Sequence, residues 1–323
     1  MTQTTQTNVP EAAADLPSGA QFEISGGGYR AVVTEAGAGL RELAAEGPGG
    51  PRPLLFGFGE QAAAHAGAGQ LLAPWPNRVA DARYRFDGED RQLDVSEPAK
   101  GNAIHGLVRW APWRPEQRAA DRVVLSHRLF PQPGYPHHLL LTAEYRVGDS
   151  GLEVTVSARN TGTRAAPYGY AAHPYLTPGA PGGPGLIDAW SLRVPAERRV
   201  LVDARLNPTG FAGVAGSDYD FRAPRPLAGV ALDTAFGSVL RDPDGIARVV
   251  LTGADGRTVT LWMDRGMEWV QVFTADPLAD DWHRAAVAIE PMSCPPDAFN
   301  SGVDLVTLAP GASVSHRWGI NAG

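Results

Sequence analysis

The sequence predicts an all-β fold, a large antiparallel β-sandwich, from three observations. Apolar and polar residues alternate in repeated short runs, which is the pattern of half-buried strands. Glycine and proline are frequent, at 38 and 28 of 323 residues, and can supply many tight turns. Turn signals such as Asp87-Gly88 and Asp255-Gly256 separate the runs. Many short strands joined by turns indicate a sandwich rather than a helical fold.

The predicted strands are spread along the whole chain. Residues 39–47 are predicted to hold a short strand and a bend. Residues 122–130 and 137–147 are predicted to pair, since the proline-rich segment 131–136 joins them. In residues 152–160 alternate apolar side chains face one way. Further strands are predicted at residues 257–264, 268–276 and 312–320.

The domain organisation is predicted to be simple. Residues 1–20 are polar and rich in alanine, and we expect a disordered leader there. Residues 21–323 show no internal repeat and no linker, which predicts a single β-sandwich domain. Within it, residues 177–185 form a proline- and glycine-rich loop that we expect to lie over a pocket.

Composition and charge restrict the class of protein. Hydrophobic residues make up 43% and charged residues 20%, as in soluble globular domains. The net charge is −7 and no Lys/Arg-rich run occurs, which argues against a nucleic-acid partner. No apolar stretch reaches the length of a membrane span, the N-terminus lacks a signal-peptide pattern, and the single Cys294 excludes an internal disulfide. We therefore expect a cytoplasmic monomer or weak homodimer that does not bind membranes.

Three ionisable residues share a local pattern that points to a cavity. They are His105, His173 and Glu290. Each has glycine or alanine two and four positions before it, so in an extended segment it shares a face with very small side chains. Glu290 also follows a small-residue and aliphatic run typical of a buried strand. A carboxylate there is costly unless it is paired or used, and the pattern therefore indicates a functional site.

Other kinds of active site find no support in the sequence. There is no H-E-x-x-H or C-x-x-C spacing, and we expect no metal. The glycine-rich residues 65–70 lead into a proline-containing segment rather than a helix, and we expect no nucleotide cofactor. A G-x-S-x-G elbow is absent, and no base is positioned by sequence beside Cys294, which argues against a covalent nucleophile.

Five segments resemble, in the same order, motifs of the aldose 1-epimerase (galactose mutarotase) family. The most specific is IEPMSCPPDAFNS, residues 289–301. The others are LLAPWPNRVADARYRFDG (71–88), HGLVRWAPW (105–113), GYAAHPYL (169–176) and LDTAFG (232–237). Together they span nearly the whole chain after the leader. LTPG follows the His-Pro-Tyr triplet here, which departs from the commoner family form and leaves the preferred sugar open.

The resemblance implies a β-supersandwich with a cleft for a free sugar and assigns roles to residues. It implies that Glu290 is the catalytic base, His173 the catalytic acid and His105 a second histidine near the ring oxygen. Arg78 and Asp233 are implied to contact sugar hydroxyls. Asn77 and Trp75 complete the expected binding set; Trp75, Trp269 and Phe273 are each candidates to stack on the sugar's apolar face.

The implied reaction agrees with the residue types. Mutarotation opens a cyclic hemiacetal and closes it on the other face, which requires a general base and a general acid but no metal or nucleotide. Burial brings a carboxyl pKa closer to neutrality, and histidine titrates near neutral pH.

Three alternatives stay open at the level of sequence. A hexose-6-phosphate 1-epimerase would use Arg78 with Arg83 and Arg85 for the phosphate. A carbohydrate-binding or sensing protein would keep the sugar contacts without turnover. A glycosidase would need Asp233 and Glu290 to flank one bond.

Overall fold

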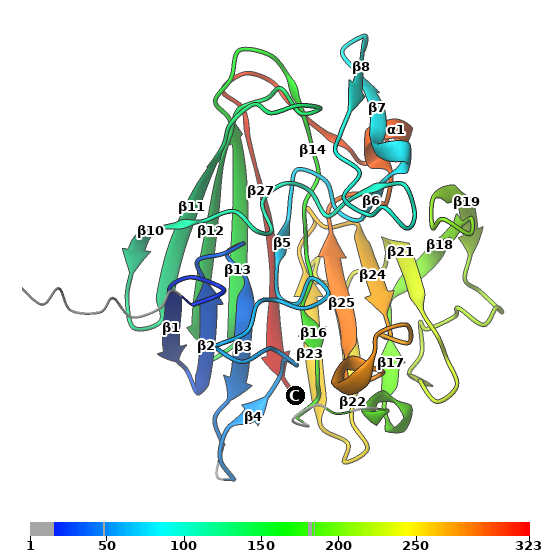
Figure 1. Ribbon diagram of the computed structural model, residues 1–323. Helices are drawn as coiled ribbons and strands as arrows, with labels where there is room; N and C mark the ends of the chain where they lie inside the picture. The colour runs from blue at the N-terminus through cyan, green and yellow to red at the C-terminus, as the bar shows by residue number, and fades with distance from the viewer. Residues whose placement is uncertain (1–15, 48, 180–182, 184) are drawn as a thin grey trace, which may run out of the picture.

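The computed structural model describes residues 16–47, 49–179, 183 and 185–323, and its strands confirm the all-β prediction (Figure 1). A four-stranded antiparallel sheet comes first in the chain: β1 (Gln21–Gly26), β2 (Tyr29–Thr34), β3 (Leu40–Ala45) and β4 (Arg52–Pro53). Strand β3 is the strand predicted within residues 39–47.

A nine-stranded sheet forms the largest layer. Its order is β10 (Arg114–Arg118), β11 (Arg122–Leu129), β12 (Leu139–Gly148), β13 (Gly151–Asn160), β27 (Ser313–Ala322), β23 (Thr258–Met263), β22 (Ala247–Thr252), β17 (Ser191–Arg193) and β20 (Arg225–Pro226). The predicted pairing of residues 122–130 with 137–147 is confirmed as β11 against β12. The C-terminal strand β27 joins the two halves of this sheet, between β13 and β23.

An eight-stranded sheet carries Asp233, Gln271 and Glu290. Its path is β19 (Pro208–Gly213), β18 (Ala196–Val202), β21 (Asp233–Val239), β24 (Trp269–Phe273), β25 (Val287–Met292), β15 (Ala171–Ala172) and β5 (Leu71–Leu72), and β16 (Tyr175–Leu176) also pairs with β25. Three small sheets pair β14 (Ala166–Tyr168) with β26 (Val306–Leu308), β6 (Arg78–Val79) with β9 (Ala103–Ile104), and β7 (Arg83–Phe86) with β8 (Glu89–Gln92). The helical turns are η1 (Ala80–Ala82), η2 (Leu186–Ala189), η3 (Asp280–Trp282) and α1 (Ala298–Ser301).

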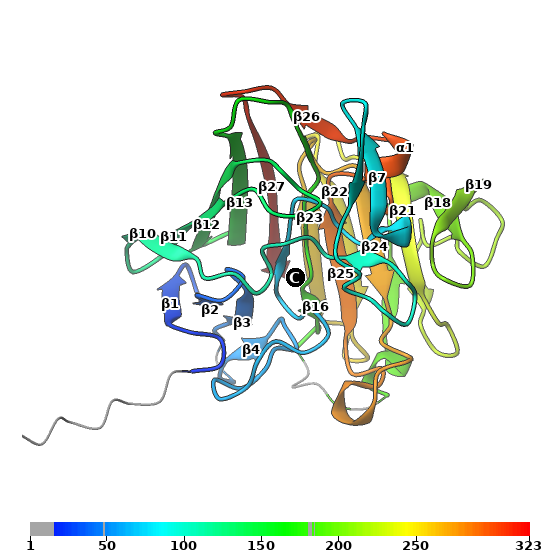
Figure 2. The ribbon, with the colours of Figure 1, turned by 45° about the horizontal axis from the view of Figure 1, so that its top comes forward.

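The four-stranded sheet and the eight-stranded sheet cover different ends of the nine-stranded sheet. Strands β1 and β2 contact β11, β12 and β13, at the left of Figure 1. The eight-stranded sheet lies over the other end, near β22 and β23, and Figure 2 shows the same arrangement from above. One hydrophobic cluster joins these layers: Val249 and Leu261 of the large sheet pack together with Val270 and Ile289 of the eight-stranded sheet. The core therefore lies between the layers and leaves the other face of β24 and β25 for a site.

The N-terminal boundary of the folded region differs from the prediction. Residues 1–15 of the predicted leader lie outside the described residues. Ser18 is buried, and its carbonyl accepts a hydrogen bond from Ala36 N at 3.0 Å. The ordered chain thus begins before residue 21. Four residues of the loop predicted to cover a pocket, residues 180–182 and 184, also lie outside the described residues.

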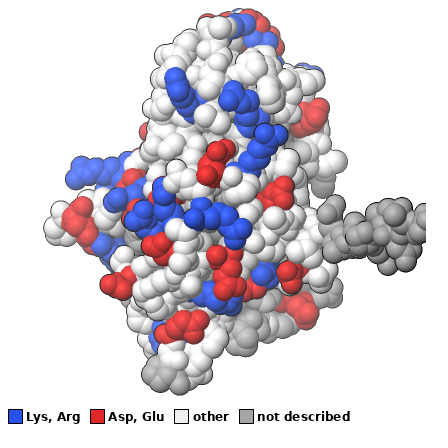
Figure 3. Space-filling view, turned by 90° about the vertical axis from the view of Figure 1, so that its left-hand side faces the viewer, with Lys and Arg blue, Asp and Glu red and all other residues white. Residues whose placement is uncertain are grey.

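The outer face of the nine-stranded sheet carries charges of both signs. Figure 3 shows basic and acidic side chains interspersed on this side of the molecule. Several of them pair across neighbouring strands, as Arg122 Nε does with Glu144 Oε1 at 2.6 Å. In the part of the chain that the structure describes, no helix is long and apolar enough to cross a membrane.

Candidate active site

A cavity of about 290 Å³ opens beside the eight-stranded sheet, and most of the predicted site residues line it. Six of the seven predicted residues are among its walls: Asn77, Arg78, His105, His173, Asp233 and Glu290. They come from segments far apart in the sequence, so the fold brings together what the chain separates.

One face of three neighbouring strands supplies the carboxylates. Strand β24 lies between β21 and β25, with Gln271 opposite Ala235 on one side and Glu290 on the other. Asp233 is two positions from Ala235 and therefore points to the same face as Gln271 and Glu290. The alternate residues Val270 and Ile289 point into the core. Strand periodicity thus separates a functional face from a packing face.

Glu290 lies within β25, which continues past it to Met292. It is only 2% exposed, and its Oε1 atom lies 3.3 Å from Nε2 of His173. Its Oε2 atom is buried and has no hydrogen-bond partner among the described residues. Burial raises the pKa of Glu290 well above its usual range; the Asp233 charge acts in the same direction and Arg78 opposes it. A carboxylate with a raised pKa is a stronger base than an exposed glutamate.

His173 occupies a break between two strands that both pair with β25. Ala171 of β15 pairs with Met292, and Tyr175 of β16 pairs with Ala288. Between these points β25 contains Pro291, which has no N–H to donate to a ladder on that side. The chain can therefore arch away from β25 at His173, and its imidazole faces Glu290. Burial lowers the pKa of His173 to about 4, and the charge of Arg109 adds to this.

The glycine-rich segment 65–70 holds His173 in place. The amide of Gly69 donates to the His173 carbonyl at 2.9 Å, and the His173 amide donates to Gln70 O at 3.0 Å. A Cβ atom at Gly67, whose φ is +82°, would lie 3.0 Å from Cδ2 of the His173 ring. This segment is thus a scaffold for the imidazole, a role that the sequence did not reveal.

His105 follows β9 and adopts a left-handed backbone conformation with φ of 64°. Its amide donates to Asn77 O at 2.8 Å, and its ring centroid lies 5.4 Å from that of His173 at a near-perpendicular angle of 83°. The Nδ1 atom is buried without a partner. Burial lowers the pKa of His105 well below its ordinary value, and the nearby His173 and Arg109 lower it further. At neutral pH this ring is a neutral hydrogen-bonding group beside His173.

The prediction that small residues two and four positions earlier share a strand face with each ionisable residue is confirmed for Glu290. It is wrong for His105 and His173. Ala286 and Ala288 pack near Tyr175 on the cavity side of β25, as the alternation predicts. Gly169 instead allows close packing, because a Cβ atom there would collide with Sγ of Cys294. His105 and Gly101 both have positive φ, so residues 101–105 are not a continuous extended segment.

Arg78 is fixed by a two-pronged ion pair. Its Nε and Nη2 atoms donate to the two carboxylate oxygens of Glu97, both at 2.8 Å. Asn77 Oδ1 accepts from the Arg78 amide at 3.0 Å. The amide of Asp297, which lies in the motif of residues 289–301, donates to Arg78 O at 2.7 Å. The guanidinium is therefore held rigidly at the cavity wall.

Asp233 is exposed at the cavity mouth but is enclosed by protein on its other sides. Its Oδ1 atom accepts a hydrogen bond from Gln271 Nε2 at 2.6 Å. Desolvation raises the pKa of Asp233, and Arg78 and Gln271 oppose that shift. Gln271 was missed in the sequence. The sequence did contain a signal for Gln271. It is a polar residue that shares one face of a predicted strand with Trp269 and Phe273.

Trp75 does not lie in the cavity, and its predicted stacking on a sugar is wrong for this structure. It is 3% exposed and packs against Phe299 and Tyr135, with ring centroids 5.6 and 6.5 Å away. Trp269 is also buried, with its Nε1 atom donating to Asp304 Oδ2 at 2.8 Å. Of the three aromatic candidates, Phe273 lines the cavity.

Arg83 and Arg85, the candidate phosphate ligands, point elsewhere. Both lie on the exposed strand β7, where Arg83 Nε donates to Gln92 Oε1 at 2.6 Å and Arg85 lies 3.5 Å from Asp90. Neither lines the cavity. Cys294 is fully buried, and burial raises the pKa of its thiol to about 12, which disfavours a nucleophilic role.

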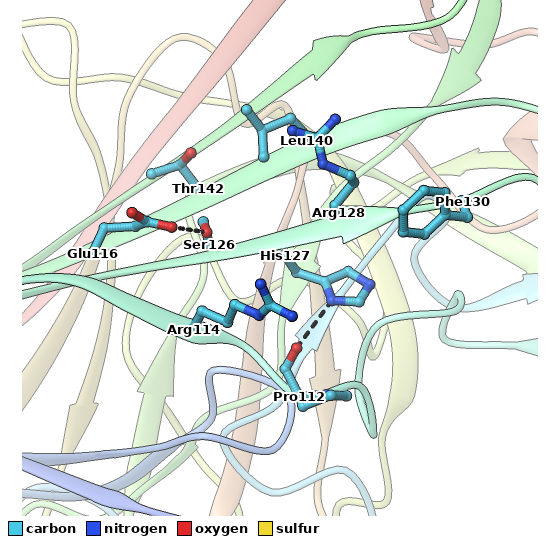
Figure 4. A pocket seen from close by; sticks show the side chains of 9 residues that line it. All are labelled: Pro112, Arg114, Glu116, Ser126, His127, Arg128, Phe130, Leu140 and Thr142. Atoms are coloured by element: carbon cyan, nitrogen blue, oxygen red, sulfur yellow. Dashed lines mark hydrogen bonds between the residues drawn. The ribbon is translucent and has the colours of Figure 1, made fainter.

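A larger hollow of about 730 Å³ lies on the outer side of β10, β11 and β12 (Figure 4). Among the side chains drawn there, Ser126 bonds to Glu116 and His127 Nδ1 lies 3.0 Å from Pro112 O. No buried acid and base face one another in it, unlike His173 and Glu290. The smaller cavity is therefore the candidate active site.

Comparisons with known proteins agree with the fold and cover most of the chain. A family model described as aldose 1-epimerase matches residues 20–321. The protein YihR of Escherichia coli (strain K12), named as uncharacterized, is 35% identical over 296 residues, which is 91% of this chain and 90% of YihR. The aldose 1-epimerase of the same bacterium is 29% identical over 165 residues, 50% of this chain and 46% of that enzyme.

Solved structures show the same architecture. A GalM/aldose epimerase homologue from C. elegans superposes with a TM-score of 0.82 at 20% identity, covering 94% of this chain and 98% of the other. Galactose 1-epimerase from Lactobacillus acidophilus NCFM superposes with a TM-score of 0.71 at 17% identity, covering 92% of each chain. The β-sandwich is therefore of the galactose mutarotase type. The extent of the family match shows that this chain belongs to the aldose 1-epimerase family.

Proposed function

We propose that this protein is an aldose 1-epimerase that interconverts the α and β anomers of an aldose with a free anomeric centre. The observation that carries the proposal is the 3.3 Å contact between His173 Nε2 and Glu290 Oε1 at the wall of the cavity. A base and an acid at that separation can serve the two oxygens bonded to one anomeric carbon.

The reaction follows from these two groups. Glu290 takes the proton of the anomeric hydroxyl while His173 gives a proton to the ring oxygen, and the bond between carbon 1 and the ring oxygen breaks. The open chain then carries an aldehyde. Rotation about the bond between carbons 1 and 2 turns its other face toward the ring oxygen, and the same two proton transfers run backwards. No atom is gained or lost in the cycle.

The pair is arranged to hold one proton. Burial raises the pKa of Glu290 and lowers that of His173, which favours the neutral forms of both side chains. The form with a carboxylate and an imidazolium is the reactive one. The positive charge of Arg78 lowers the pKa of Glu290 and thus favours this form.

The remaining walls can hold a sugar while leaving the anomeric end free. Asp233 and Arg78 present a carboxylate and a guanidinium, which bind hydroxyls strongly as charged partners. His105 Nδ1 is a buried polar atom without a protein partner and can bond near the ring oxygen. Phe273 offers an aromatic face.

Polarimetry tests the proposal directly. Freshly dissolved α-glucose and α-galactose should reach their equilibrium rotation faster with the protein than without it, and heat-inactivated protein is the control. A sugar-binding protein without turnover would bind one of these sugars in calorimetry and leave the rate unchanged.

A further inference from the structure

The loop of residues 97–102, which leads into β9, carries the ion-pair partner of Arg78. The amide of Glu97 donates to Asn102 O at 2.9 Å, and Glu97 O accepts from the Gly101 amide at 2.9 Å, so the loop closes on itself. The Glu97 carboxylate then receives two hydrogen bonds of 2.8 Å from Arg78. The place of the Arg78 guanidinium at the cavity wall therefore depends on where this loop lies.

Arg205 ties the loop to another part of the site. It lies in residues 203–207, the turn that joins β18 to β19. Its Nε atom donates to Lys100 O at 2.8 Å, and its Nη2 atom donates to Asp81 Oδ1 at 2.6 Å. Asp81 belongs to η1, which directly follows β6. One guanidinium thus joins the loop of residues 97–102 to the segment that follows β6.

The surroundings of Arg205 hold it in one place. Asp203 Oδ1 accepts a hydrogen bond from the Arg205 amide at 2.8 Å. The buried Asn102 donates from Nδ2 to Arg205 O at 3.2 Å and accepts at Oδ1 from the Asp81 amide at 3.2 Å. A Cβ atom at Gly101, whose φ is +70°, would lie 2.9 Å from Nη2 of Arg205. The turn and the loop are therefore fitted to this guanidinium from both sides.

Neither substrate contact nor folding stability accounts for this arrangement. Arg205 does not line the cavity. Its side chain is 44% exposed and that of Asp81 is 64% exposed, and an ion pair so accessible to water adds little to the stability of a fold. What the contact restricts is the freedom of Glu97 and, through it, of Arg78.

We propose, resting on the function above, that Arg205 is a positioning residue, which holds the loop of residues 97–102 so that Glu97 fixes the Arg78 guanidinium toward the sugar. Without Arg205, the pair of Glu97 and Arg78 moves as a unit and must be ordered each time a sugar binds. That cost falls on binding. Glu290 and His173 are held by β25 and its neighbours, so the proton transfers are affected less.

The kinetic test uses Arg205→Gln and whichever of α-glucose and α-galactose the native protein accelerates more. We expect KM to rise about 3- to 30-fold and kcat to fall less than about threefold, because ordering rather than chemistry is lost. Arg205→Lys keeps the charge but not the planar fork and should restore part of KM. A KM that stays unchanged, or a loss confined to kcat, overturns the inference.

Arg164→Gln is the matched control. Arg164 is 49% exposed and binds two carboxylates, Asp87 and Glu89, on the hairpin of β7 and β8. Its removal should leave KM and kcat as they are. An equal rise of KM in both variants would show a general effect of losing a surface arginine and would contradict the inference.

A double-mutant cycle tests the route through Glu97. Glu97→Gln removes the carboxylate that binds Arg78, so a second substitution, Arg205→Gln, should then change KM by less than about twofold. The full effect of Arg205→Gln in the Glu97→Gln background would mean that Arg205 acts by another route. The proposed positioning of Arg78 would then be wrong.

The side-chain Nε–H signal of Arg78 gives a readout that does not need turnover. This group donates to Glu97 at 2.8 Å, so it should exchange slowly with water and appear in a ¹H–¹⁵N spectrum, assigned by its loss in Arg78→Lys. In Arg205→Gln its exchange should be at least about tenfold faster, and in Arg164→Gln it should stay as in the native protein. Melting temperatures confirm that each variant is folded.

Failure of the inference is distinguishable from failure of the proposed function. Accelerated mutarotation, with an Arg78 signal that Arg205→Gln does not change, keeps the function and removes the inference. If no sugar is accelerated, the function fails and the Arg78 signal decides alone. Faster exchange in Arg205→Gln then supports the positioning of Arg78, and unchanged exchange refutes it.

Discussion

Nε2 of His173 lies 3.3 Å from Oε1 of Glu290, and both side chains are buried at the wall of one cavity. The contact exists because β25 pairs with β15 and with β16, and His173 lies between those two strands. Sheet pairing therefore sets the separation of the proposed acid and base.

Glu290→Gln is expected to abolish catalysis and spare the fold. Glutamine keeps the shape of the side chain but cannot accept the anomeric proton, so the polarimetric rate should fall by at least about a hundredfold. Sugar binding by calorimetry should be largely retained. A variant that melts far below the native protein yet turns over sugar normally would make Glu290 a structural residue.

The rate of the native protein is expected to be bell-shaped in pH. As pH falls toward the pKa of His173, about 4, the pair takes a second proton and Glu290 can no longer accept one. As pH rises through the raised pKa of Glu290, the pair loses its single proton and His173 has none to donate. The two limits are properties of the pair.

The variants His173→Asn and Glu290→Gln should change opposite limbs of that profile. Without the acid, activity rises with deprotonation of Glu290 and the alkaline limb disappears. Without the base, activity depends on a protonated His173 and the acidic limb disappears. Residual rates are measured at high protein concentration; identical profiles for both variants would exclude separate roles.

Gln271→Leu should weaken substrate binding through Asp233. The amide of Gln271 donates to Asp233 Oδ1 at 2.6 Å, and leucine removes that hydrogen bond at similar size. We expect KM to rise about 3- to 30-fold, the range for loss of one ordinary hydrogen bond, with a smaller change in kcat. Gln271→Glu, which places a second negative charge beside Asp233, should be worse; an effect on kcat alone would argue against a role in positioning Asp233.

Chelation is expected to leave the activity intact. In the part of the chain that the structure describes, no group of three or more His, Cys, Asp or Glu side chains is placed to hold a metal ion. Acid–base ring opening needs none. Overnight treatment with EDTA followed by desalting should keep the mutarotation rate, and a loss that zinc or magnesium restores would show this to be wrong.

His137 is expected to make the protein less stable in acid. Both ring nitrogens are buried without partners, and burial lowers the pKa of His137 to about 4. The unfolded state, with a pKa near 6.5, then binds more protons than the folded state, so stability present above pH 6.5 is lost as pH falls toward 4. The contribution is at most about 3 kcal/mol.

Denaturant unfolding at pH 7 and pH 4 measures this effect. His137→Gln should lose less stability between the two pH values than the native protein does, whatever its stability at pH 7. The other buried histidines remain in both proteins and cancel in the comparison. An unchanged difference between the two pH values would show that His137 takes up as many protons in the folded state as in the unfolded state.

The sequence by itself determined the fold class and several strands. The alternation of Leu152, Val154 and Val156 appears in β13 as buried side chains, because the twofold period of a strand is a local property. The ordered motifs also located Glu290, His173, His105, Arg78, Asp233 and Asn77, and the structure places all of them at one cavity. Their proposed catalytic and binding roles stay predictions.

Only the tertiary structure decided which residues with suitable chemistry reach the cavity. Trp75 packs in the core, whereas Arg109 and Gln271, to which the sequence assigned no role, lie at or beside the site. Arg83 and Arg85 carry the same charge as Arg109 but lie on an exposed strand. Local sequence sets which way a side chain leaves its strand, but the pairing of distant strands and the packing of layers set what it meets. That is why the acid–base pair could be named from the chain, while the position of Arg109 in the same cavity became known only from the folded protein.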